Sequence, residues 1–107
     1  MSENEQGENM TQNKYLLRIR EMAMAHFKYT PTKIYLFGSW ARGTQRRSSD
    51  VDIAIKYDSS DARQKIADLR ESLEESTIPY RVDVVDMNFA SEAILEEIQR
   101  DGIAWTA

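Results

Sequence analysis

Apolar residues recur along this chain with two different periods. Residues 13–27 place apolar side chains at every third or fourth position, the period of an amphipathic helix, and Pro31 prevents its continuation. Residues 60–75 and 91–100 show the same period, and Gly102 follows the last of these segments. The pattern therefore predicts three main helices. The apolar positions of the first are Leu16, Ile19, Ala23 and Phe27, of the second Ala62, Ile66, Leu69 and Leu73, and of the third Ile94, Leu95 and Ile98.

Between these helices lie three short segments typical of β-strands, at residues 33–37, 50–57 and 80–86. A further helical turn is predicted at residues 39–42. The helix between the second and third strands predicts a right-handed parallel crossover. The expected fold is α/β (α+β): a small mixed β-sheet with helices packed against it.

Composition limits the chain to one domain. It has 107 residues, of which 41% are hydrophobic, enough for a single core. Residues 1–11 are polar and aperiodic and are predicted to be a disordered tail, which leaves residues 12–107 as the domain. There is no cysteine, no signal peptide and no apolar run of membrane-spanning length, so a soluble cytoplasmic protein is expected.

The net charge of −4 and the pI of about 5.0 argue against an extended nucleic-acid surface. A small phosphorylated ligand remains compatible with this charge, because a few local cations and a metal ion can hold it.

The second predicted strand begins with two carboxylates. Asp50 and Asp52 are two residues apart, which on a strand places both side chains on one face. Such close like charges repel unless a divalent, oxygen-preferring cation such as Mg²⁺ neutralises them. A solvated strand end with no metal role is the alternative for this pair.

The first predicted strand ends at Gly38 and Ser39, and glycine at such a bend permits close backbone approach. The Ser39 hydroxyl and the amides that follow can bind phosphate oxygens, although a Gly-Ser pair is also an ordinary turn. Ten residues separate Ser39 from Asp50.

A third carboxylate is predicted from the third strand, which carries Asp83 and Asp86 on opposite faces. Only one of them can face the pair on the second strand. Asp83 is the predicted ligand, because a charge flanked by valines within a strand needs a partner, whereas Asp86 lies near the strand end and can be solvated.

The combined motif, Gly38-Ser39 followed by ten residues, Asp50-x-Asp52 and a downstream Asp83, resembles the minimal nucleotidyltransferase (MNT) family of the DNA-polymerase-β-like superfamily. The resemblance extends to Ala41-Arg42-Gly43 and Ser49-Asp50, and covers about residues 30–105.

By this resemblance, the three aspartates would be the catalytic and metal-binding residues and would hold two Mg²⁺ ions, while ATP is the expected substrate. Gly38, Ser39, Arg42 and Ser49 would form the nucleotide site, with Ser39 on the β- or γ-phosphate. Arg42 would either stabilise phosphate charge or brace the loop through a bond to backbone or carboxylate. Two metal ions stabilise both the entering oxygen and the leaving pyrophosphate, so His26, the single histidine, is expected to serve packing or to lie on the surface.

Arg46 and Arg47 precede Asp50 and could contact triphosphate, an acidic acceptor or only solvent. Trp40 could serve as lid, packing residue or partner contact. The sequence fixes neither the base nor the oligomeric state.

Three functions are compatible with the motif. The resemblance implies an antitoxin that moves AMP from ATP onto a hydroxyl of a HEPN-type toxin encoded by a neighbouring gene. The first alternative is a binding module that masks a partner protein without turnover. The second is transfer to a small molecule, which larger relatives perform with an added domain.

Overall fold

The structure is a computed structural model that describes residues 13–106. The predicted tail at residues 1–11 lies outside the described residues. Nine elements follow one another: α1 (Lys14–His26), β1 (Thr32–Phe37), α2 (Ser39–Arg42), β2 (Val51–Tyr57), α3 (Ala62–Glu74), β3 (Val82–Asp86), the 3-10 helix η3 (Met87–Phe89), α4 (Glu92–Asp101) and β4 (Ile103–Ala104).

The four strands form one mixed sheet in the order β3-β2-β1-β4. β1 pairs antiparallel with β2 and with β4, whereas β2 pairs in parallel with β3. The predicted parallel connection through the intervening helix is therefore confirmed. β3 lies at one edge of the sheet, so its outer side has no neighbouring strand.

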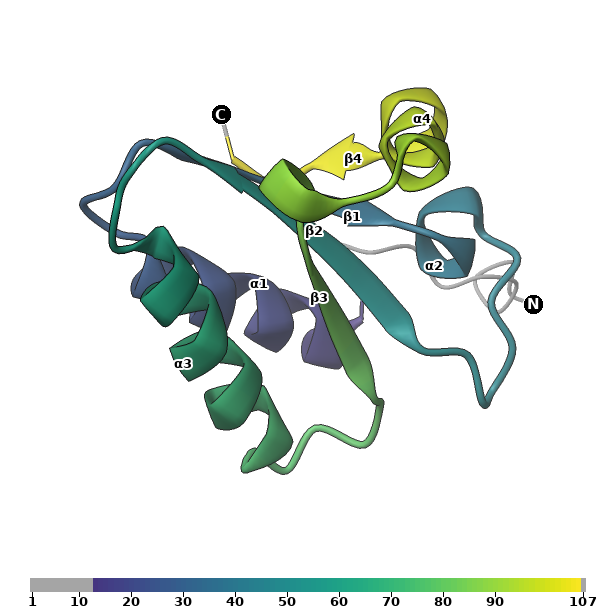
Figure 1. The fold of residues 1–107 in the computed structure, drawn as a ribbon. Coiled ribbons are helices and arrows are strands. Elements are labelled where there is room, and N and C mark those ends of the chain that lie inside the picture. The colour runs from purple at the N-terminus through teal and green to yellow at the C-terminus, as the bar shows by residue number, and fades with distance from the viewer. Residues whose placement is uncertain (1–12, 107) are drawn as a thin grey trace.

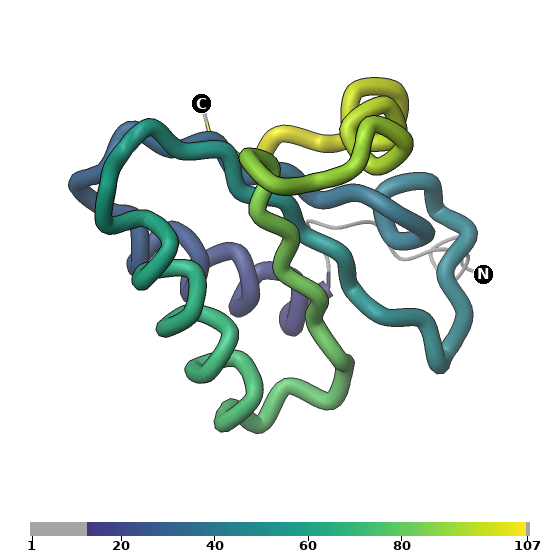
Figure 2. Tube along the Cα trace, in the orientation of Figure 1, coloured from purple at the N-terminus to yellow at the C-terminus, as the bar shows by residue number. Residues whose placement is uncertain are grey.

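Helices cover both faces of this sheet (Figure 1). α1 and α3 lie on one face and α4 lies on the other. Figure 2 shows how the chain leaves the end of β3, turns through η3 and reaches the face that carries α4. The class predicted from the sequence, a small mixed sheet with helices packed against it, is confirmed.

The main core lies between the sheet and the α1–α3 layer. All predicted apolar positions of α1 and α3 are buried there, together with Val51, Ile53 and Ile55 of β2. A smaller core on the other face contains Phe37, Ala54 and Ile98. Side chains alternate strictly along β2, so Val51, Ile53 and Ile55 point into the main core. Asp52 and Ala54 point to the other face of the sheet.

Side-chain caps define where α1 and α4 begin. The Asn13 side chain, only 5% exposed, accepts hydrogen bonds from the amides of Tyr15 and Leu16 at 2.9 and 3.1 Å. Ser91 caps α4 in the same way through the Ile94 amide at 3.2 Å. Each cap satisfies amides that lack a partner within the helix.

Some expected boundaries were wrong. β2 begins at Val51 rather than Asp50, because the first ladder bond at this end is from the Val51 amide to the Arg81 carbonyl, 2.9 Å long. β3 begins at Val82, and β4 was not predicted because two residues carry no readable period. Leu95 is only half-buried and belongs to neither core, unlike Ile94 and Ile98.

Within residues 13–106, none of the helices has the length and apolar character needed to cross a membrane.

Candidate active site

The bend after β1 brings the backbone against an acidic side chain. Gly38 has φ +78°, which favours glycine, and a β-carbon built there would collide with the Asp52 carboxylate oxygen. α2 starts immediately afterwards and ends at Gly43, which is left-handed with φ +76°. The Gly-Ser bend and Asp52 therefore form one site, although twelve residues separate Ser39 from Asp52 in the sequence.

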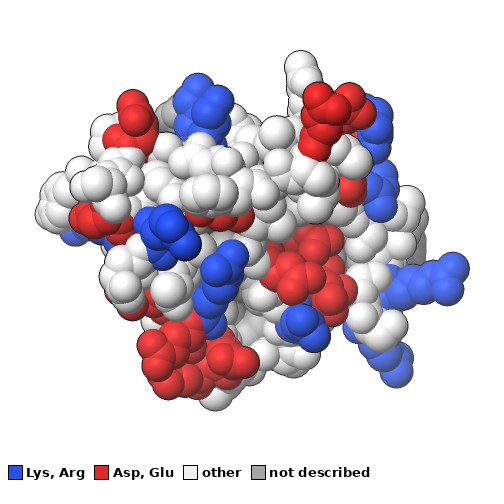
Figure 3. Space-filling view, viewed as in Figure 1, with Lys and Arg blue, Asp and Glu red and all other residues white. Residues whose placement is uncertain are grey.

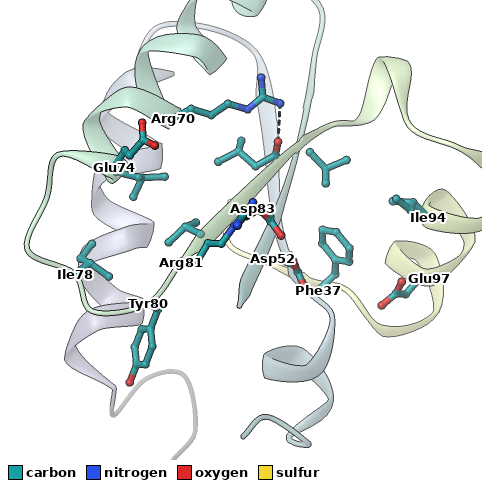
Figure 4. A pocket seen from close by; sticks show the side chains of 14 residues that line it. Phe37, Asp52, Arg70, Glu74, Ile78, Tyr80, Arg81, Asp83, Ile94 and Glu97 are labelled. Atoms are coloured by element: carbon teal, nitrogen blue, oxygen red, sulfur yellow. Dashed lines mark hydrogen bonds and ion pairs between the residues drawn. The ribbon is translucent and has the colours of Figure 1, made fainter. Parts of the chain in front are cut away.

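Asp52 and Asp83 are direct neighbours across the parallel strands β2 and β3. Alternation along each strand places both side chains on the face that carries α4, as Figure 4 shows. Asp86 points to the opposite face, where it accepts hydrogen bonds from the Tyr57 hydroxyl and the Asn88 amide, both 3.0 Å long. The choice of Asp83 over Asp86 as the residue beside Asp52 agrees with this geometry.

The environment of Asp52 opposes its ionisation. Its pKa is raised from 3.8 to about 6, first by burial and then by the nearby charges of Asp83, Asp50 and Glu97 in that order. A hydrogen bond with the Asp83 side chain acts in the same direction. Two carboxylates this close share a proton unless a cation lies between them.

This donor set fits a divalent cation. Carboxylate oxygens are the ligands that Mg²⁺ prefers, and its charge would replace the proton that Asp52 otherwise takes up. Asp50 precedes β2 and adds its charge, but residues 13–106 contain no group of three His, Cys, Asp or Glu side chains arranged to hold a metal ion. The structure thus brings Asp52 and Asp83 together, and Asp50 as a third ligand stays a prediction.

A cleft of about 880 Å³ opens beside this carboxylate pair and follows the edge strand β3 (Figure 4). α4 contributes Ile94 and Glu97 to one side of the cleft, and α3 contributes Arg70 and Glu74 to the other. The Arg70 guanidinium donates to the Val84 carbonyl at 2.7 Å, which occupies one acceptor on the open edge of the sheet. The cleft gives a ligand access to both Asp52 and Asp83.

Asp83 has one cationic neighbour. The Arg81 guanidinium lies 3.5 Å from its carboxylate, and both side chains are largely exposed, at 76% and 43%. An ion pair so open to solvent contributes little stability. The structure therefore leaves Asp83 accessible from the cleft.

Arg42 pairs with two acidic residues of α4. Its guanidinium bonds to Glu97 of α4 at 3.0 Å and lies 3.6 Å from Asp101. Of the two roles open for Arg42, the bond to a carboxylate is the one that the structure shows. Glu97 was not identified from the sequence, although its three-residue spacing from Ile94 places both on one helix face.

The loop between α2 and β2 holds the remaining predicted residues. The Ser49 hydroxyl accepts from the Arg46 amide at 2.7 Å, so it supports the loop itself. The side chains of Arg46 and Arg47 are exposed. Trp40 packs at 5.1 Å against the ring of Tyr80 and is a packing residue.

His26 lies away from this site. Its ring nitrogens face the Met22 carbonyl at 3.0 Å and the Ser72 hydroxyl at 3.4 Å, between α1 and α3. The expected packing role is confirmed.

Charged side chains are unevenly spread over this face of the molecule (Figure 3). Acidic side chains gather beside the ends of β2 and β3, and basic side chains surround them at intervals. The site therefore attracts cations directly and requires a counter-ion before it can hold a polyanion.

The chain belongs to the polymerase beta nucleotidyltransferase family, whose model matches residues 18–104. It has the fold of this family, and the family resemblance recognised in the motif is confirmed.

Individual relatives agree with this assignment. The chain is 39% identical over 71 residues to the protein adenylyltransferase MntA of Shewanella oneidensis, covering 64% of this chain and 49% of that one. The match thus spans about half the length of that relative.

Two solved structures are similar. One, a toxin-antitoxin complex with AMP-PNP, has a TM-score of 0.66 and 27% identity, covering 82% of this chain and 73% of that chain. The other, provisionally described as a minimal nucleotidyltransferase, has a TM-score of 0.65 and 27% identity, covering 82% and 90%.

Proposed function

We propose that this protein transfers AMP from ATP to a hydroxyl of a partner protein, and that the partner is a HEPN-type toxin encoded by a neighbouring gene. The observation that carries the proposal is the pairing of Asp52 with Asp83 beside the Gly38 bend. The similar protein named an adenylyltransferase and the similar toxin-antitoxin complex with AMP-PNP support the choice of ATP and of a protein acceptor.

The bend and the two strands have different roles in the proposed reaction. The Ser39 hydroxyl binds the β- or γ-phosphate, and Gly38 lets the triphosphate come close to the backbone. Asp52 lies next to this bend, and both Asp52 and Asp83 line the cleft along β3. The acceptor hydroxyl therefore enters from the cleft and meets the α-phosphate between the two carboxylates.

The transfer forms a bond between the acceptor oxygen and the α-phosphorus. The bond from the α-phosphorus to the bridging oxygen of the pyrophosphate breaks, and the hydroxyl proton passes to solvent. Two Mg²⁺ ions, when bound, supply charge that stabilises both the entering and the leaving oxygen. Asp50, Asp52 and Asp83 are proposed to hold these ions.

A labelling experiment tests the proposal. The protein is incubated with α-labelled ATP, Mg²⁺ and the product of the neighbouring gene, and label on the partner is measured. We expect the wild type to label the partner and Asp52→Asn to leave it unlabelled. Asp58→Asn is the matched control, because Asp58 lies exposed just after β2 and away from the cleft.

The same proteins distinguish transfer from masking. If the Asp52→Asn variant neutralises the toxin as fully as the wild type does, the protein acts by covering its partner. Loss of neutralisation together with loss of label supports transfer. Equal labelling by wild type and Asp52→Asn would rule out the assigned site.

A further inference from the structure

Arg42 is joined to α4 through one end of its guanidinium group. The Nη1 atom lies 3.0 Å from the Glu97 carboxylate and 3.6 Å from that of Asp101. A guanidinium carries five N–H donors. No hydrogen bond or ion pair within residues 13–106 involves another side-chain nitrogen of Arg42, whose side chain is 40% exposed. Arg42 therefore keeps donors available while it is bound to α4.

The two acidic partners of Arg42 differ in their other contacts. Asp101 also pairs with Arg100 at 3.2 Å, and it does not line the cleft. Glu97 pairs with Arg42 alone among the described residues. Glu97 is thus the acid that loses its cation if Arg42 moves, while Asp101 retains one.

Glu97 also belongs to the cleft that contains Asp52 and Asp83. Figure 4 shows its side chain projecting from α4 toward the space beside Phe37 and Asp52. A carboxylate in this position repels an incoming triphosphate, and it holds Arg42, a cation three residues after Ser39. Both effects weaken nucleotide binding.

We propose that Glu97 sets the nucleotide affinity of this site by holding Arg42, and that Arg42 exchanges Glu97 for a phosphate of the bound nucleotide. The inference rests on the proposed function, because it assigns the triphosphate to the bend at Gly38 and Ser39. Arg42 ends α2, three residues after Ser39, so it is carried by the same short element. The two roles predicted for Arg42 then correspond to two states of the site. Arg42 binds a carboxylate when the site is free of nucleotide, and it binds a phosphate when nucleotide is bound.

The exchange is compatible with the stability of the fold. An ion pair with side chains 40% and 30% exposed contributes little to folding. α4 stays attached to the sheet through the buried Ile98 and the packed Ile94. Phosphate oxygens accept paired N–H donors from arginine at least as well as a carboxylate does. Glu97 is therefore a positioning residue that acts through Arg42.

Calorimetric titration with AMP-PNP and Mg²⁺ tests this inference. We expect Glu97→Gln to lower the Kd by about three- to tenfold, because it removes a repelling charge and releases Arg42. Arg42→Gln is expected to raise the Kd by about tenfold through loss of a charge-assisted bond to phosphate. Glu96→Gln is the matched control: it removes the same charge from the exposed side of α4 and should leave the Kd unchanged.

The double variant decides whether Glu97 acts through Arg42. In the Arg42→Gln background, Glu97→Gln should lower the Kd by clearly less than it does in the wild type, because only the removal of the repelling charge remains. Equal tightening in both backgrounds would show simple charge repulsion and overturn the exchange. Glu97→Gln that binds as wild type, or more weakly, also overturns it.

A second variant covers failure of the first to fold. Glu97→Asp keeps the charge but is one methylene shorter, so it holds Arg42 less well and should also lower the Kd. An unchanged Kd for this variant contradicts the proposal. Wild-type protein that neither binds AMP-PNP nor labels its partner refutes the proposed function itself, whereas binding and labelling with unchanged Glu97 variants refute only this inference.

Discussion

Gly38 lies so close to Asp52 that a β-carbon at position 38 would overlap the carboxylate. The contact links the end of β1 to the middle of the site, and the backbone at Gly38 has φ +78°. Two independent constraints, backbone conformation and space, therefore require glycine here. The pairing of β1 with β2 holds Gly38 close to Asp52, because Phe37, the residue before Gly38, lies opposite Asp52 in the strand register.

Substitution of this glycine should impair both folding and transfer. We expect Gly38→Ala to lower the free energy of unfolding by about 1–3 kcal/mol and to abolish labelling of the partner, because Asp52 must move. Denaturant unfolding and the labelling assay measure the two effects. Gly43→Ala is the matched control: Gly43 has φ +76° but no atom within 4 Å of its virtual β-carbon. It should lose about 1 kcal/mol and remain active.

Removal of the Asp52 charge should stabilise the metal-free protein while it abolishes transfer. Burial and three neighbouring acids oppose ionisation of this carboxyl. We expect Asp52→Asn to raise the free energy of unfolding at pH 7 by roughly 1 kcal/mol, allowing for solvent screening of this half-exposed group. Urea titration in the presence of a chelator measures the change. A less stable variant would contradict the origin of the raised pKa.

The same carboxyl predicts how stability depends on pH. Its pKa is about 6 in the folded protein, whereas the value without burial and the neighbouring acidic charges is 3.8. Protonation of Asp52 therefore favours the folded state. The contribution from Asp52 is complete below pH 3.8 and is lost as pH rises through 6. The stability difference between wild type and Asp52→Asn should therefore grow between these values and then level off. A difference that is constant from pH 3 to pH 8 would refute this prediction.

Substitutions of the two aspartates of β3 should have different effects, one on transfer activity and the other on stability. Asp83→Ala should abolish transfer with little change in stability, because its pair with Arg81 is exposed. Asp86→Ala should retain transfer but lose about 1–2 kcal/mol, because the Tyr57 hydroxyl and the Asn88 amide lose their acceptor. Labelling and thermal unfolding of both variants test the assignment. If Asp86→Ala abolished transfer and Asp83→Ala reduced stability instead, the roles assigned to the two residues would be wrong.

The cap of α1 offers a test of the fold away from the site. The Asn13 side chain accepts two backbone hydrogen bonds and is almost fully buried. Asn13→Ala should cost about 1–2 kcal/mol, whereas Asn13→Asp should retain the cap. Thermal unfolding compares the variants, and transfer by the folded protein should be unchanged. Equal destabilisation by both substitutions would show that burial rather than capping matters.

The sequence determined the main helices and strands and the buried face of most of them, but neither β4 nor η3. Apolar periods located α1, α3 and α4, and alternation located the inward residues of β2, because burial of an apolar stripe acts on local spacing. The motif around Gly38, Ser39 and Asp52 was readable for the same reason, since its parts lie within one stretch of chain. Strand alternation showed that only one of Asp83 and Asp86 could face Asp52, and the strand register places Asp83 opposite Asp52.

Only the tertiary structure decided how distant segments meet. The register of β2 against β3 placed Asp83 opposite Asp52, and the position of β3 at the sheet edge opened the cleft beside them. The contact of Arg42 with Glu97 depends on where α4 crosses the sheet, which no local pattern encodes. The period of apolar residues shows which side of a helix or strand is buried. Which charged side chains pair depends on the distances between them, and these are set only when the helices pack against the sheet.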